Sequence, residues 1–406
     1  MSPLIDSGYA WRRLLASVII STMGGIGMWA LAVAMPAVQI DLGVTRADIS
    51  FAYSMNMMGF VVGGVVLGRL VDRRGIVFTS TLSAIGLAAG FALATATSSL
   101  IMFAAAQSLV GFSAAATFAP LIADISHWFE KRRGIAVAIA ASGNYIAGTI
   151  WPPIVQLLIH DHGWRFAYLS FSVLCLITMI PLALTLGRRP PDHDAANTAT
   201  VTSRSIASLG LSPNALQALL VLAGLSCCVA MSMPQVHIVA YCADLGYGVA
   251  RGAEMLSLML GFGIVSRIAS GWLADRVGGA MTLLIGSTLQ CLALVFYLIS
   301  DSLVSLYISS ALFGLFQGGI VPSYAIIIRE YFPAREAASR VGLTVSSTIV
   351  GMALGGWMGG VLFDITGSYR AAFINGIAWN VLNAAIAWWL LSRQMRQPRR
   401  SGAAAA

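Results

Sequence analysis

Charged residues are scarce in this sequence: Asp, Glu, Lys and Arg make up 10% of the 406 residues, whereas 58% are hydrophobic. A soluble domain carries about 25% charged residues, because its surface must be hydrated. The mean hydropathy of +0.82 points the same way. These values exclude most soluble enzymes, secreted disulfide scaffolds and disordered chains, and they predict an integral membrane protein.

Cysteine and lysine are rare as well. The five cysteines lie inside apolar runs without Cys-x-x-Cys spacing, so they predict neither a disulfide framework nor a metal site. Lys131 is the only lysine, and the net charge of +8 therefore comes from arginine. No Walker or Gly-x-Gly-x-x-Gly fingerprint follows a predicted strand, so we expect neither ATP-driven transport nor a bound cofactor.

Long apolar runs are what the sequence has in abundance. A membrane-spanning helix needs about 20 apolar residues to cross a hydrocarbon layer of about 30 Å. The first run is too long for the apolar part of a signal peptide, so we interpret it as an uncleaved helix. Together the runs predict an all-α membrane protein with twelve spans. Their ranges are 14–40, 49–71, 76–97, 101–125, 134–159, 166–187, 214–241, 252–274, 281–300, 303–328, 339–363 and 371–391.

One long polar stretch, residues 188–213, divides these runs into two sets of six. It is rich in Pro, Asp, Ser and Thr, and we interpret it as a flexible cytoplasmic linker. The predicted domains are an N-terminal half, 1–187, and a C-terminal half, 214–400. Residues 401–406 are of low complexity and predict a disordered tail.

The arginines predict the orientation in the membrane. If the N-terminus is inside, only Arg46, Arg165, Arg251 and Arg370 fall in outer loops. This distribution follows the positive-inside rule and accounts for the basic charge without nucleic acid. We therefore expect a multi-pass protein of the inner (plasma) membrane with both termini in the cytoplasm.

The two halves share motifs at a constant offset of 203 residues. Asp41-Leu42-Gly43 recurs as Asp244-Leu245-Gly246, and GRLVDRRG at 68–75 recurs as GWLADRVG at 271–278. Phe129 and Phe332 also match. A parallel duplication of six helices is typical of alternating-access transporters, whose substrate site lies between the repeats.

These motifs carry a resemblance to a known family. GRLVDRRG resembles the loop signature between the second and third helices of the major facilitator superfamily. Within it, DSGYAWR at 6–12 and HWFEKRRGIAVAIAASGNYIAG at 127–148 resemble motifs of the monocarboxylate transporters and the bacterial oxalate/formate-type exchangers. SRIASGWLADR at 266–276 places Arg267 where that family has an eighth-helix arginine.

The resemblance implies the major facilitator fold and a secondary transporter, not an enzyme. The implied substrate is a small organic anion, most simply a monocarboxylate such as lactate or pyruvate. Transport would run by proton symport or anion exchange, with the lipid bilayer as the other partner. Two alternatives stay open: an exporter of drugs or other neutral compounds, and a non-transporting sensor built on a carrier fold.

The sequence also departs from that family. Its animal members pair a first-helix lysine with an eighth-helix aspartate, but this chain has no lysine in the first span. Gly263 occupies the aspartate position, four residues before Arg267. The eleventh-helix lysine of the oxalate exchangers is missing too. A single cation within the spans argues against a dianion such as oxalate.

Arg267 is the rarest feature of the chain. It lies eight residues before Asp275, about 12 Å from the cytoplasmic end of its span. An arginine near the membrane centre costs at least about 2.5–3.5 kcal/mol. Its repeat counterpart is Gly64, so the fold itself does not require a cation. We favour a guanidinium that binds a substrate carboxylate; the alternative is an arginine that snorkels toward Asp275 or a backbone carbonyl.

Further polar and aromatic side chains within the spans are weaker candidates for substrate binding, because each can equally bond a neighbouring helix. His237 could also carry a proton, the alternative being a neutral histidine packed between helices. These candidates are Trp29, Phe118, Asn144, Tyr145, His237, Gln317, Tyr324 and Ser347.

The repeated loop motif predicts a gate at the cytoplasmic side. Asp72 and Asp275 could each accept hydrogen bonds from the positive N-terminus of a helix in the other half. By resemblance, Arg73 and Asp124 join Asp72, and Arg276 stands beside Asp275. The alternative is that the arginines only set the topology.

Overall fold

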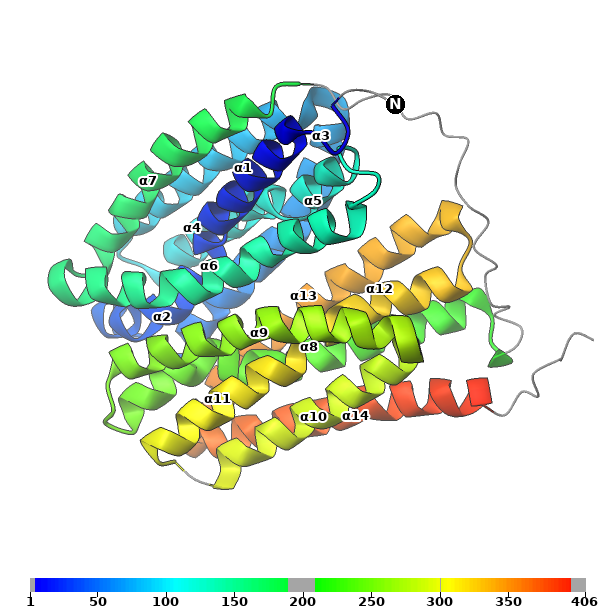
Figure 1. The fold of residues 1–406 in the computed structure, drawn as a ribbon. Helices are drawn as coiled ribbons and strands as arrows, with labels where there is room; N and C mark the ends of the chain where they lie inside the picture. Colours follow the sequence, from blue (N-terminus) through cyan, green and yellow to red (C-terminus); the bar gives the residue numbers. More distant parts are fainter. Residues whose placement is uncertain (1–3, 189–208, 300, 396–406) are drawn as a thin grey trace, which may run out of the picture.

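The computed structural model describes residues 4–188, 209–299 and 301–395, and almost all of them are helical (Figure 1). The first half contains α1 (Gly8–Gly24), α2 (Ile26–Leu42), α3 (Arg46–Thr95), α4 (Leu100–Ala114), the 3₁₀ turn η1 (Ala115–Thr117), α5 (Ala119–Ser126), α6 (Arg133–His162) and α7 (Trp164–Thr185). The second half contains α8 (Pro213–Asp244), α9 (Val249–Val277), α10 (Gly279–Ile299), α11 (Leu303–Gln317), α12 (Ile320–Tyr331), α13 (Ala334–Thr366) and α14 (Tyr369–Met395).

Within the described residues, eleven helical segments are long and apolar enough to cross a membrane. One of them, α3, has 50 residues and is interrupted at Gly75, so it supplies two passes. The predicted all-α architecture with twelve spans in two halves is therefore confirmed. Residues 189–208 and 396–406 lie outside the described ranges, and most of the predicted linker and the whole predicted tail fall there.

The repeated loop motif folds into the same turn in both halves. Gly75 has φ 83° and ψ 169°, and its counterpart Gly278 has φ 83° and ψ 166°. A side chain would be strained at such positive φ values, which glycine adopts freely. The motif thus requires glycine at this point of each half in order to turn the chain.

Three predicted spans are interrupted rather than continuous. The first is broken at Gly25, the fourth at 115–118 and the tenth at Gly318. Two of the breaks lie where helices approach closely. A Cβ added at Gly25 would lie 2.4 Å from the Ala147 Cβ, and one at Gly318 would lie 2.4 Å from the Gly263 carbonyl oxygen. Close packing between helices explains these glycines.

The two halves lie side by side, α1–α7 above α8–α14 in Figure 1. Helices α1 and α8 start, and helices α7 and α14 finish, at the same end of the molecule, which we call the linker end. We call the other end the opposite end. The halves meet along α3 and α13, α6 and α9, and α2 and α8. Glycines make the first seam tight: a Cβ at Gly356 would lie 2.8 Å from the Tyr53 ring, and one at Gly360 would lie 2.7 Å from the Arg46 carbonyl oxygen.

Polar contacts between the halves are confined to one part of this interface. Among the described residues, hydrogen bonds and ion pairs that join the halves occur only from the opposite end as far as Arg267. Asp72 and Asp275, at the linker end, are exposed. The halves are therefore fastened at the opposite end and not at the linker end.

Candidate functional site

Arg267 lies on the interface between the halves. It belongs to α9, but its guanidinium carbon lies 4.4 Å from the centroid of the Tyr145 ring on α6. Its Nη1 also donates a hydrogen bond to the Ala141 carbonyl oxygen, at 3.3 Å. Both contacts are with the first half, whereas Asp275 lies further along α9 and is exposed.

The guanidinium of Arg267 is incompletely satisfied. Its Nε is buried and has no hydrogen-bond partner, and no Asp or Glu in ranges 4–188, 209–299 and 301–395 forms an ion pair with it. A guanidinium has five N–H donors and no acceptor, and a partly buried cation is stabilised by an anion. The site is therefore chemically suited to a carboxylate.

Gly263 determines what stands next to this cation. A Cβ at Gly263 would lie only 2.4 Å from Cε1 of Tyr145, so the ring fills the space that a side chain would need. Tyr145 is 9% exposed. Where the resemblance would place an aspartate, this structure has an aromatic face against Arg267.

Of the predicted residues, Tyr145 contacts Arg267, and Trp29 and Asn144 lie next to Tyr145 in the first half. Trp29, which is 3% exposed, donates from Nε1 to the Asn144 carbonyl oxygen at 3.2 Å. The Asn144 Nδ2 lies 3.6 Å from the Met28 sulfur. These bonds join α2 to α6, and Tyr145 of α6 contacts the cation on α9.

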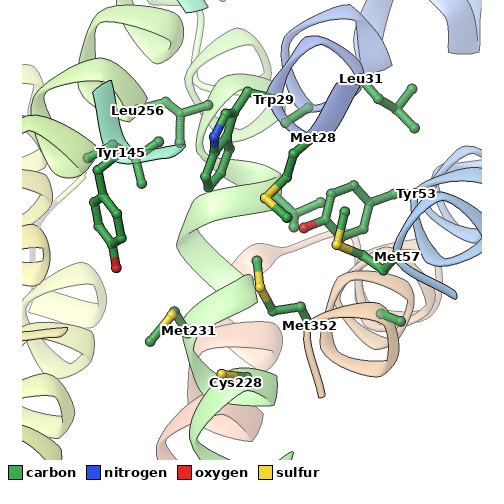
Figure 2. Close-up of a cluster of buried hydrophobic side chains, with 14 of the residues drawn as sticks. Met28, Trp29, Leu31, Tyr53, Met57, Tyr145, Cys228, Met231, Leu256 and Met352 are labelled. Atoms are coloured by element: carbon green, nitrogen blue, oxygen red, sulfur yellow. The ribbon is translucent and has the colours of Figure 1, made fainter. Parts of the chain in front are cut away.

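A cluster of buried apolar side chains, which we call the sulfur-rich cluster, lies between the halves. Figure 2 shows them converging from α2, α3 and α6 of the first half and α8, α9 and α13 of the second. All are at most 9% exposed. The sequence offered only a weak signal for them, since methionine in an apolar span forms no pattern. The labelled members are Met28, Trp29, Leu31, Tyr53, Met57, Tyr145, Cys228, Met231, Leu256 and Met352.

The remaining predicted binding residues do not join this group. His237 is fully buried with Nε2 2.8 Å from the Gly356 carbonyl oxygen, and Ser347 donates to the Thr344 carbonyl oxygen at 2.7 Å. These bonds stay within the second half.

The tenth-span candidates also bond within the second half. Gln317 accepts a hydrogen bond from Gln235 at 2.8 Å, and Tyr324 donates to Asn383 at 2.8 Å. Phe118 is half-buried at the break before α5. Among the described residues, no hydrogen bond, ion pair or ring contact joins these three to Arg267.

The predicted gating residues lie at the linker end. Asp72, Arg73, Asp275 and Arg276 are exposed there, and the guanidinium carbon of Arg276 lies 3.7 Å from the Trp272 ring centroid.

Asp124 has a partner that the sequence analysis did not assign to it. It forms an ion pair with Arg13, with N–O distances of 2.7 and 2.8 Å, rather than with Arg73. Asp72 and Asp124 line one cavity of about 610 Å³ in the first half.

A group of charged residues at the opposite end, which we call the Arg46 lock, was not predicted from the sequence. Arg46, the first residue of α3, donates to the Tyr369 hydroxyl at 2.8 Å and to Asp244 at 3.2 Å. Asp364 of α13 accepts hydrogen bonds from the backbone N–H groups of Arg46 and Ala47, at 3.1 and 2.7 Å. A carboxylate of the second half thus caps a helix of the first.

The repeated Asp-Leu-Gly motif is the sequence feature from which the Arg46 lock could have been suspected, because its second copy contains Asp244. Its first copy pairs within its own half, because Asp41 accepts from Arg165 at 2.6 Å. Its second copy, through Asp244, instead reaches across to Arg46. The motif therefore has one structural copy and one copy that holds the halves together.

Comparison with known proteins identifies the same superfamily as the sequence motifs. The sequence model of the Major Facilitator Superfamily matches residues 17–304 and 255–406. Monocarboxylate transporter 13 of Rattus norvegicus is 29% identical, over 80% of this chain and 74% of that protein. Monocarboxylate transporter 11 of Homo sapiens is 26% identical, over 91% and 80% respectively. An MFS-type transporter of Gibberella moniliformis is 24% identical, over 96% and 91%.

Solved structures share the fold. A bacterial homolog of the human lysosomal transporter Spinster, in an inward-facing and unoccupied conformation, has a TM-score of 0.74 at 15% identity and covers 96% of this chain and 98% of its own. A nucleoside transporter has a TM-score of 0.73 at 15% identity, with coverages of 94% and 99%. At such identities the likeness concerns the fold alone.

Proposed function

Because the chain belongs to the Major Facilitator Superfamily, and is thus a membrane transporter rather than an enzyme, we propose that it carries small organic anions, with monocarboxylates as the substrate class. The observation that carries this proposal is Arg267. It is a half-buried cation between the halves, with one donor unpaired and no carboxylate partner among the described residues.

The chemistry of the site favours one carboxylate. A guanidinium binds a carboxylate through two parallel hydrogen bonds. The Tyr145 ring contacts Arg267, and Tyr145 in turn lies among apolar side chains (Figure 2). An anion with a single charge fits a single cation. The similarity to the rat and human monocarboxylate transporters supports the same class.

The proposed cycle is alternating access. Basic residues gather at the linker end, including Arg69, Arg73 and Arg74, so we place this end in the cytoplasm. The fastened opposite end then faces outward, and the described conformation is inward-facing. Rocking of the halves would expose Arg267 to each side in turn, coupled to proton symport or to anion exchange in the inner membrane.

The function is tested by uptake of labelled lactate and pyruvate into proteoliposomes. We expect Arg267→Ala and Arg267→Lys to weaken the apparent affinity at least about tenfold, since hydrogen bonds to charged groups contribute about 1.5–3 kcal/mol each. Arg251→Ala removes an exposed cation from the same helix, outside the predicted site and gate, and serves as the control. Transport of neutral compounds only, or unaltered affinity after loss of Arg267, would overturn the proposal in favour of an exporter of neutral compounds.

A second prediction concerns Gly263, which lies four residues before Arg267 where the resemblance places an aspartate. In Gly263→Asp, a carboxylate four residues before Arg267 can pair with it on one face of α9. Gly263→Ala produces the same steric conflict with Tyr145 without the charge. We expect the Asp variant to bind pyruvate about tenfold more weakly than the Ala variant. Calorimetry on both purified variants makes the comparison, and equal affinities would contradict it.

A further inference from the structure

Tyr145 joins two different surfaces. One is the guanidinium of Arg267, 4.4 Å from its ring centroid. The other is the sulfur-rich cluster, in which Tyr145 lies with Trp29 and Leu256 (Figure 2). The cation is therefore continuous with an apolar surface. A ligand that contacts both must have a carboxylate at one end and an apolar body at the other.

The composition of the cluster indicates what kind of body it would accommodate. Four methionines, Met28, Met57, Met231 and Met352, come from four different helices and from both halves. Methionine side chains are flexible and polarisable, so they adapt their shape to a ligand and make favourable contacts with aromatic rings. A three-carbon acid bound at Arg267 has too little apolar surface to reach them.

One polar atom in the cluster is also unsatisfied. The hydroxyl of Tyr53 is buried and, among the described residues, has no hydrogen-bond partner. A buried hydroxyl is normally paired, because leaving it unpaired is costly. The cluster is part of the packed core between the halves, but it keeps one hydroxyl unpaired that a ligand can bond.

We infer that the preferred substrates are monocarboxylates with a bulky apolar body, aryl or branched alkyl, and not two- or three-carbon acids. The carboxylate binds Arg267, the body lies along Tyr145 and Trp29, and the methionines enclose its far end. This inference rests on the proposed function, because it takes Arg267 as the anion site.

The test compares two acids that share a 2-oxo-carboxylate head. Phenylpyruvate differs from pyruvate only by its phenyl group. We expect wild-type protein to bind phenylpyruvate at least tenfold more tightly, measured by calorimetry in detergent and by competition with labelled pyruvate in proteoliposomes. Equal affinities, or tighter binding of pyruvate, would overturn the inference while leaving the proposed function intact.

Variants locate the origin of this preference. Met231→Ala with Met352→Ala should lower the phenylpyruvate-to-pyruvate affinity ratio at least threefold, whereas the matched Leu replacements, which keep the apolar volume, should retain it. A thermal melt of each variant shows that it is folded. Arg267→Ala should weaken both acids and preserve the ratio. An unchanged ratio in the Ala variants would place the phenyl group elsewhere and overturn the inference. Undiminished binding of both acids in Arg267→Ala would refute the proposed function itself.

Discussion

Arg13→Ala is expected to lower the free energy of unfolding by about 3–5 kcal/mol, because it leaves Asp124 as a buried carboxylate without its cation. The Arg13 side chain is 0% exposed and that of Asp124 is 8% exposed. Their two hydrogen bonds, at 2.7 and 2.8 Å, form a bidentate pair. Truncating one partner of such a pair costs more than losing an exposed ion pair, which contributes at most about 1 kcal/mol.

Arg13 also connects three helices of the first half. Beyond Asp124 of α5, its Nη1 donates to the Leu186 carbonyl oxygen after α7 at 2.9 Å. Its guanidinium carbon lies 4.4 Å from the centroid of the Trp128 ring. We therefore expect the variant to loosen the linker end of this half as well as to lower its stability.

Denaturant unfolding of the purified protein in detergent measures this loss. Arg12→Ala is the matched control, because Arg12 is the neighbouring arginine and is exposed. The double variant Arg13→Met with Asp124→Leu should recover most of the stability, since apolar residues can replace a buried pair at little cost. If Arg13→Ala and Arg12→Ala unfold within about 1 kcal/mol of each other, the pair does not stabilise the half.

The Arg13–Asp124 ion pair could not be predicted from the sequence. Sequence alone classed Arg13 as a topology charge and Asp124 as a gate residue, because nothing in either helix announces a partner 111 positions away. The motifs at 6–12 and 127–148 could be recognised in the sequence, but their packing against each other could not be predicted from it. In the structure Asp6 accepts from the Lys131 backbone N–H at 3.0 Å, and the Trp11 and Phe129 ring centroids lie 5.1 Å apart.

The fold was more predictable than the site, for physical reasons. The length of apolar runs is fixed by the thickness of the membrane, and the Gly75 and Gly278 turns require a residue that tolerates positive φ, so both leave a mark in the sequence. Arg267 could be found because a charge inside a span is rare. That the Tyr145 ring lies over Gly263 is a relation between two helices, and it became visible only in the packed structure.

The second large effect concerns the conformational equilibrium. Arg46→Ala removes the hydrogen bonds to Tyr369 and Asp244 that fasten the halves at the opposite end. Interactions of this charged kind contribute about 1.5–3 kcal/mol each. A loss of about 3 kcal/mol shifts a two-state equilibrium roughly hundredfold. We expect the population to move toward a state that is open at the opposite end.

Labelling of a buried cysteine reports this opening. Ser50 is 0% exposed at the α3–α13 seam. A cysteine introduced by Ser50→Cys, in a chain whose native cysteines are replaced, is therefore inaccessible to reagents as long as the Arg46 lock is formed. With Arg46→Ala added, its reaction with a membrane-impermeant maleimide should become at least about tenfold faster. Arg370→Ala is the control, because Arg370 lies at the same end but pairs at 3.8 Å with Asp301 of its own half. That pair does not cross the interface, so its loss should leave the labelling rate unchanged. Equal rates in the Arg46→Ala and Arg370→Ala variants would mean that apolar packing along α3 and α13, not the Arg46 lock, keeps this end closed.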